Sequence, residues 1–139
     1  MPHDLDADTW FEQAIRDLGA AGHLLRGGYP AHATVFAHLA VEKALKGIVR
    51  RQTGEPPPVT HDLRHLADAL DLVWNPDRRD ALDGLSDVSI LSLYAPDQPF
   101  GHPVSEQSTA ARERVADARM LVGWLTGTGE DGGRRPGTE

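Results

Sequence analysis

Apolar residues recur at helical spacing along most of the chain. The first such segment begins near Thr9 and ends before two consecutive glycines, and its apolar positions are Trp10, Phe11, Ala14, Ile15, Leu18, Ala21, Leu24 and Leu25. Residues three and four apart share one face of a helix, so this pattern predicts an amphipathic helix. Thr9 is its predicted N-cap, and Glu12 completes a capping box.

A second helix is predicted from Pro30 to Thr53. Proline is tolerated in a first helical turn, and Gly54 is a typical helix stop. One face carries the apolar residues Val35, Phe36, Leu39, Ala40, Leu45, Ile48 and Val49, and the other carries Glu42, Lys43, Lys46 and Arg50. The short gap between the first two helices favours an antiparallel hairpin.

Three further helices follow a stiff Pro-rich connector, Glu55–Val59. The third is expected to begin at Thr60 as N-cap and to end near Asn75, and the fourth to run from about Asp77 to Tyr94. Residues 95–103 are expected to form a loop, and Ser105 is the predicted cap of a fifth helix that continues to Leu125. No segment shows the alternating pattern of a strand.

These patterns predict one all-α domain, an up-and-down four-helix bundle with a fifth shorter helix. We expect residues 1–8 to be a flexible N-terminus, residues 9–126 to form the bundle, and the glycine-rich residues 127–139 to be a disordered tail.

Composition narrows the chemistry. The 139 residues include no cysteine, which excludes disulfides and thiol nucleophiles, and the net charge of −7 argues against broad attraction to a phosphate backbone. No long apolar run or signal peptide is visible, so we expect a cytoplasmic protein that does not enter a membrane.

Two segments of the chain resemble the signature of the HEPN domain family. They are FAHLAVEKALK at residues 36–46 and, after the Pro-rich connector, THDL at residues 60–63. The resemblance implies a helical bundle that forms a homodimer. It also implies that this protein binds a nucleotide or RNA and is the partner of a minimal nucleotidyltransferase, in a two-protein module of the toxin–antitoxin kind. Trp10, Phe11 and Trp124 are the expected apolar patch of the dimer.

The strongest candidate binding surface is the cationic strip, which we define as Lys43, Lys46 and Arg50. Their spacing places three cations along one helix face, where they suit phosphate oxygens. The alternative is an ordinary solvated face on which Glu42 pairs with Lys46 one helical turn away.

Histidines are the other candidates. His61 is a possible ligand-binding or catalytic residue at the start of the third helix, whereas His38 is expected to be a hydrogen-bonded, partly buried imidazole. His61 and His65 have a spacing that can hold a metal ion, but no third ligand motif accompanies them. We therefore predict neither a metal nor a cofactor.

The ribonucleases of the family resembled carry an Arg followed by four to six residues and a His on the later helices. Here only Arg26 and His32 have that spacing, and they flank the first interhelical turn, so we treat them as coincidental. His102 has no suitable Arg before it. The family's catalytic pair is thus not found, which leaves His61 and His102 as remaining candidates for catalysis. A metal-independent RNA endonuclease toxin and a ligand-free dimerisation or adaptor bundle stay open as alternatives.

Tyr94 is the last candidate. Members of the family resembled carry Arg-Tyr-Pro at the end of the fourth helix, and this chain has Leu93-Tyr94-Ala95-Pro96 there. The resemblance implies that Tyr94 lines a ligand cleft or is modified by the partner. The alternative is a tyrosine that caps the end of the bundle.

Overall fold

The structure is a computed structural model that describes residues 5–89, 93 and 104–128, with side chains of the last helix from Gln107 onward. Within these residues every regular element is a helix, which confirms the all-α prediction. In chain order the helices are α1 (Ala7–Arg26), α2 (Pro30–Thr53), α3 (Leu63–Asp68), α4 (Pro76–Ser86) and α5 (Val104–Thr126).

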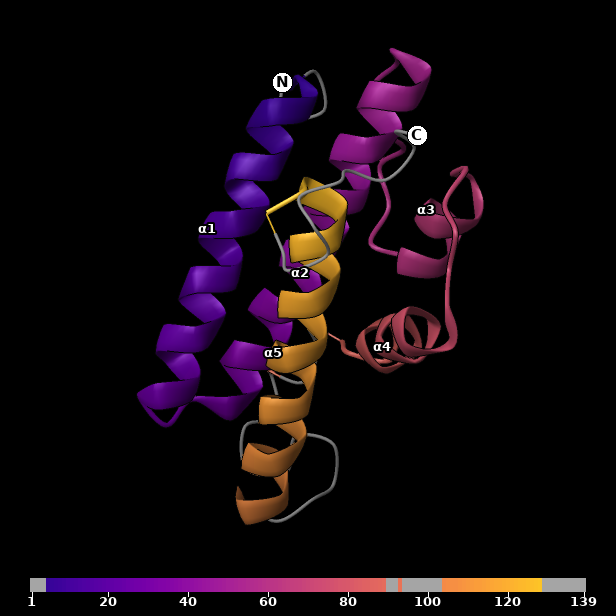
Figure 1. Ribbon diagram of the computed structural model, residues 1–139. Coiled ribbons are helices and arrows are strands. Elements are labelled where there is room, and N and C mark those ends of the chain that lie inside the picture. Colours follow the sequence, from indigo (N-terminus) through magenta and orange to yellow (C-terminus); the bar gives the residue numbers. More distant parts are fainter. Residues whose placement is uncertain (1–4, 90–92, 94–103, 129–139) are drawn as a thin grey trace.

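The three long helices form the body of the bundle. As predicted, α1 and α2 are an antiparallel hairpin, and α5 packs against both of them (Figure 1). The short helices α3 and α4 lie on the side of α2 away from α1, and α4 crosses the long helices, so that it is seen nearly end-on in Figure 1. As a result α2 is contacted by all four other helices.

This central position changes the environment of α2. Fifteen of its 24 residues are buried, and they include His38, Glu42 and Lys46 as well as most of the apolar stripe. The sequence predicted that Glu42 and Lys46 belong to a polar face turned toward water. That expectation is wrong because neighbouring helices cover both faces of α2, so its polar groups must find partners inside the protein.

The ends of α1 and α2 are set by local chemistry. The carboxylate of Asp6 accepts a hydrogen bond from the backbone N–H of Thr9 at 2.8 Å, so α1 begins at Ala7 and Thr9 is not the cap that we predicted. The prediction for the other end of the hairpin is confirmed. Gly54 ends α2 with φ 72°, a left-handed conformation that glycine adopts at little cost.

Helix α3 is shorter than predicted. Its N-cap is Asp62, which accepts from the backbone N–H of His65 at 3.1 Å, while the Thr60 hydroxyl accepts from the backbone N–H of Asp62. Thr60 therefore shapes the turn before the helix rather than capping it. The helix ends at Asp68, and Val73, an apolar residue within the range predicted for this helix, is 80% exposed.

Helices α4 and α5 also begin and end at different residues from those predicted. Asn75 caps α4 through a 2.8 Å hydrogen bond from the backbone N–H of Arg78. The helix ends at Ser86 instead of continuing to Tyr94, which lies outside the described residues. Helix α5 begins at Val104, one residue before the predicted cap at Ser105.

The aromatic residues expected to form a dimer patch are buried. Trp10, Phe11 and Trp124 are only 4%, 5% and 7% exposed. Phe11 packs on Gly47, where any side chain would collide with its ring, and Trp74 meets Trp124 edge-on with ring centroids 5.1 Å apart. These aromatic side chains stabilise the core of the protomer, so the predicted apolar patch does not exist on its surface.

No helix in the described part of the chain is both long enough and apolar enough to cross a membrane. Most of the predicted flexible N-terminus and disordered tail, residues 1–4 and 129–139, lies outside the described residues. Within the predicted N-terminus, Ala7 and Asp8 belong to α1.

Candidate functional site

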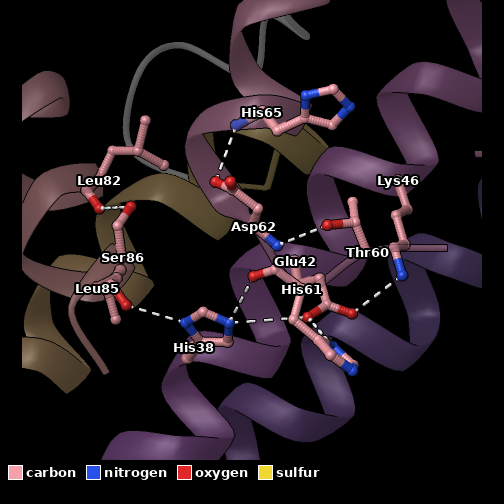
Figure 2. A network of polar contacts seen from close by, with 10 residues as sticks. All are labelled: His38, Glu42, Lys46, Thr60, His61, Asp62, His65, Leu82, Leu85 and Ser86. Carbon is pink, nitrogen blue, oxygen red and sulfur yellow. Dashed lines mark hydrogen bonds and ion pairs between the residues drawn. The ribbon is translucent and has the colours of Figure 1, made fainter. Parts of the chain in front are cut away.

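A buried carboxylate organises the polar contacts of α2. The side chain of Glu42 is 5% exposed, and Figure 2 shows it surrounded by nitrogen atoms. The Nζ of Lys46 donates to Oε2 at 3.1 Å, and the Nδ1 of His61 lies 2.8 Å from Oε1. The Nε2 of His38 is 3.7 Å from the same Oε1. We call these four residues the Glu42 cluster.

Lys46 lies on the side of the cluster that faces α1. It is 4% exposed, and its ammonium group sits 5.7 Å from the centre of the Trp10 ring. An aromatic face attracts a cation, but the carboxylate of Glu42 supplies the opposite charge that a buried ammonium needs. Lys46 and Glu42 therefore form a pair that is stable only while both members are present.

His38 joins three elements. Its Nδ1 lies 2.9 Å from the carbonyl oxygen of Leu85 in α4, and its Nε2 lies 3.2 Å from the carbonyl oxygen of His61 before α3 (Figure 2). Carbonyl oxygens only accept hydrogen bonds, so a neutral ring satisfies one of them and a protonated ring satisfies both. The prediction of a partly buried, hydrogen-bonded imidazole is confirmed.

His61 differs from His38 in its exposure. Its side chain is 82% exposed although the carboxylate that it contacts is buried. The Nδ1–H donates to Glu42, and this contact fixes the ring so that Nε2 is the nitrogen left for another partner. A histidine oriented in this way by a carboxylate can accept a proton or, once protonated, contact an anion.

A pocket of about 220 Å³ lies beside the cluster, where α2 meets the segment before α3 and the end of α4. Its walls are mainly apolar, with imidazoles and hydroxyls at a few points. The lining residues are Val35, His38, Leu39, His61, Ser86, Val88 and Ser89. Apolar walls with a few polar groups are typical of small-molecule sites.

The cationic strip predicted from the sequence does not form a continuous exposed surface. Lys46 is inside the Glu42 cluster, and Lys43 pairs with Asp17 of α1 at 2.8 Å. Arg50 donates to the carbonyl oxygen of Gly54 at the end of its own helix. Lys43 thus has a carboxylate from α1 beside it and Lys46 has one from its own helix, and none of the three cations lines the pocket.

Comparison with known proteins settles the family. The model of the HEPN domain matches residues 7–128, nearly the whole of the described chain. The chain belongs to the HEPN family. No curated protein matches it at a significant level.

Two solved structures share this HEPN fold. One is ST0689, described as an archaeal HEPN homologue, with 28% identity, a TM-score of 0.67, and coverage of 88% of this chain and 97% of that one. The other is TT1696 from Thermus thermophilus, with 27% identity, a TM-score of 0.70, and coverage of 84% of this chain and 92% of that one.

The two segments that carry the HEPN resemblance contact each other in the fold. Glu42 belongs to the first segment and His61 to the second, and they form the 2.8 Å contact at the centre of the site. Sequence reasoning selected His61 and gave the Glu42–Lys46 pair as an alternative, and that pair is present, but it missed the burial of Glu42 and its contact with His61. A signal was present, because His38 and Lys46 lie one helical turn before and after Glu42, where both can reach its carboxylate.

The remaining candidates are not brought into the site. Within residues 5–89 and 107–128, no three His, Asp or Glu side chains are placed to hold a metal ion, and His65 is not part of the pocket lining. Tyr94 and His102 lie outside the described residues.

Proposed function

We propose that this HEPN protein binds a nucleotide or an RNA and acts with a minimal nucleotidyltransferase in a two-protein, toxin–antitoxin-like module. The observation that carries the proposal is the position of His61. Its exposed imidazole, held by the buried carboxylate of Glu42, stands at the edge of a pocket with apolar walls.

The chemistry of the pocket suits a nucleoside. Val35, Leu39 and Val88 offer apolar surface to the faces of a base, while the Nε2 of His61 is available to a ribose hydroxyl or a phosphate oxygen. The hydroxyl of Ser86, a lining residue, donates to the carbonyl oxygen of Leu82 at 2.6 Å, so its oxygen is left to act as an acceptor.

The binding test compares two histidines. ATP and a short RNA are titrated into the protein and into the His61→Ala and His65→Ala variants by isothermal titration calorimetry. His65 is an exposed residue of α3, four positions after His61 and outside the pocket lining, so its variant is the control. We expect at least about tenfold weaker binding for His61→Ala alone, because a hydrogen bond to a charged group contributes about 1.5–3 kcal/mol.

Two results oppose the binding proposal. Equal binding by all three proteins would remove His61 from the site. Binding by none of them would favour a ligand-free adaptor bundle. The protein-partner half of the proposal is tested separately. We expect a gene for a minimal nucleotidyltransferase beside the gene for this chain, and we expect the two proteins to co-purify. Sedimentation reports whether the protein forms the homodimer that we propose.

A second candidate function is that of a metal-independent RNA endonuclease. The Glu42–His61 contact favours it, because a carboxylate-oriented imidazole is a common general base. None of the residues lining the pocket is an arginine that would stabilise phosphate charge. Incubation of the protein with tRNA and mRNA tests this candidate. Cleavage that is lost in His61→Ala and kept in His65→Ala would support it over simple binding.

A further inference from the structure

Two arginines from different helices meet above Gly22 of α1. A side-chain carbon built on Gly22 would lie 2.9 Å from the Nη2 of Arg119, which extends from α5, and 3.3 Å from the Nη1 of Arg26, at the end of α1. Both guanidinium groups are therefore within 3.3 Å of one point. The absence of a side chain at Gly22 leaves the space in which Arg119 crosses onto α1.

Neither guanidinium has a carboxylate beside it. Among the described residues, the side chains of Arg26 and Arg119 make no ion pair and no hydrogen bond with another residue. By contrast, Lys43, Lys46 and Arg64 each lie beside an acidic side chain. The sequence has 21 acidic residues and only 14 Lys and Arg. In a chain with more acidic than basic residues, unpaired carboxylates are expected by chance. Two adjoining cations without a counter-charge are not.

We propose that Arg26 and Arg119 bind a phosphate group. Two like charges held side by side repel each other, and an anion between them removes this repulsion. Guanidinium groups present planar pairs of N–H donors that match phosphate oxygens. The arginines alone hold the anion here, because the C-terminal end of α1 carries partial negative charge, which favours Arg26 and not a phosphate.

The arginine pair is separate from the pocket. It belongs to α1 and α5, whereas the pocket is lined by α2, the segment before α3 and the end of α4, on the other side of the central helix. The inference therefore does not depend on the function proposed for His61. Free phosphate and the phosphodiester backbone of a nucleic acid share the chemistry that the pair recognises, so the experiment must distinguish them.

The test uses inorganic phosphate and hexauridylate as separate probes, in calorimetric titrations of the full chain at low salt. Arg26→Ala, Arg119→Ala and the double variant are compared with Arg16→Ala. Arg16 is an exposed cation on α1, nearly two turns before Gly22, and it matches the loss of one charge without touching the pair.

We expect each single variant of the pair to bind the recognised probe about tenfold more weakly than Arg16→Ala. The fold-loss of affinity in the double variant should be smaller than the product of the fold-losses in the two single variants, since both side chains hold the same phosphate. If the phosphate group that the pair recognises belongs to a nucleic acid, hexauridylate binds appreciably and inorganic phosphate does not. Its salt dependence then becomes shallower by about 0.7 per arginine removed. If the source is free phosphate, both probes depend on the pair.

Three results would overturn the inference. The first is a loss in the variants of the pair no greater than that in Arg16→Ala. The second is no binding of either probe by the unaltered protein. The third is a change in sedimentation of the unliganded protein on removing either arginine, which would mean that the pair meets carboxylates of a second copy. Because hexauridylate is also a short RNA that the pocket beside His61 is proposed to bind, each titration is repeated in the His61→Ala background. A further loss there on removing Arg26 or Arg119 belongs to the arginine pair, so each proposal fails separately.

Discussion

The protein holds its cations in two contrasting regions. In the Glu42 cluster on α2, an ammonium is buried and directly paired with a carboxylate. In the pair formed by Arg26 and Arg119 between α1 and α5, two guanidinium groups are exposed, adjoin each other, and have no carboxylate partner in the described part of the chain. One region has its charges neutralised by the fold, and the other still requires a counter-charge.

This difference shows that the spacing of cations along one helix does not by itself identify an anion-binding site. Lys43, Lys46 and Arg50 have ideal spacing, but α1 covers Lys43 and Lys46, and both have carboxylates beside them. Arg26 and Arg119 are far apart in sequence, and only the packing of α5 against α1 brings them together. What decides the outcome is which helices cover the cations and which carboxylates then lie beside them.

The largest expected effect is at Glu42. Glu42→Gln keeps the shape of the side chain but leaves the buried ammonium of Lys46 without an opposite charge, which should lower the free energy of unfolding by about 3–5 kcal/mol. The measurement is urea denaturation. The control is Asp17→Asn, which breaks the more exposed pair with Lys43 and should cost about 1 kcal/mol or less.

Replacing both members of the buried pair sharpens this test. Glu42→Gln combined with Lys46→Met removes the uncompensated charge, so the double variant should regain much of the lost stability. Equal losses in Glu42→Gln and Asp17→Asn would contradict the claim that the two pairs differ in burial.

An intermediate effect is expected from two glycines, one in each region. Gly47→Ala puts a methyl group into the ring of Phe11 and should cost about 1–3 kcal/mol through overpacking. Gly22→Ala meets only the ends of the flexible Arg119 and Arg26 side chains, which can move aside. Its stability should stay the same or rise by up to about 1 kcal/mol, since alanine favours helices. Thermal denaturation of both variants checks the prediction, and a similar loss in both would refute it.

The smallest effect concerns pH and two carboxyl groups on the helices that bear the arginine pair. The hydrogen bond from the backbone of Thr9 lowers the pKa of Asp6 below its usual value. Asp6 therefore contributes stability above the pKa that it has in the unfolded chain, and this contribution is lost as the pH falls through its folded pKa. Burial raises the pKa of Asp117, an effect that Arg114 partly offsets, so ionisation of Asp117 weakens the fold as the pH rises through its folded pKa.

Unfolding free energies measured between about pH 2 and pH 6 test these opposite signs. Asp6→Asn should flatten the loss of stability at the acidic end while keeping the helix cap, because asparagine is an equally good N-cap. Asp117→Asn should flatten the decline in unfolding free energy that ionisation of Asp117 causes as the pH rises. The same sign in both variants would show that the two carboxyl groups are not perturbed in opposite directions.

Much of the fold could be predicted from the sequence. The apolar stripes, the Gly54 stop and the short turn before Pro30 are local signals, and they sufficed for the α1–α2 hairpin and the all-helical architecture. The lengths of α3 and α4 were overestimated, because an apolar residue such as Val73 fits a helical pattern whether or not another element covers it.

The site was less predictable. His61 was selected from the THDL segment, and the position of Glu42 between His38 and Lys46 was visible as a spacing of one helical turn. That Glu42 is buried, however, depends on the elements that surround α2. The pairing of Lys43 with Asp17 and the approach of Arg119 to Arg26 likewise join residues from different helices, which no pattern along one helix reveals.

The imidazole of His38 also fixes the width of the pocket. The ring lies between the carbonyl oxygens of His61 and Leu85, so it keeps apart the two walls that carry these residues whether it donates to one oxygen or to both. A ligand too thick for the gap must move one of these walls away from the ring. We therefore expect the pocket to bind flat ligands in preference to thick ones, and to keep nearly the same shape with and without a ligand.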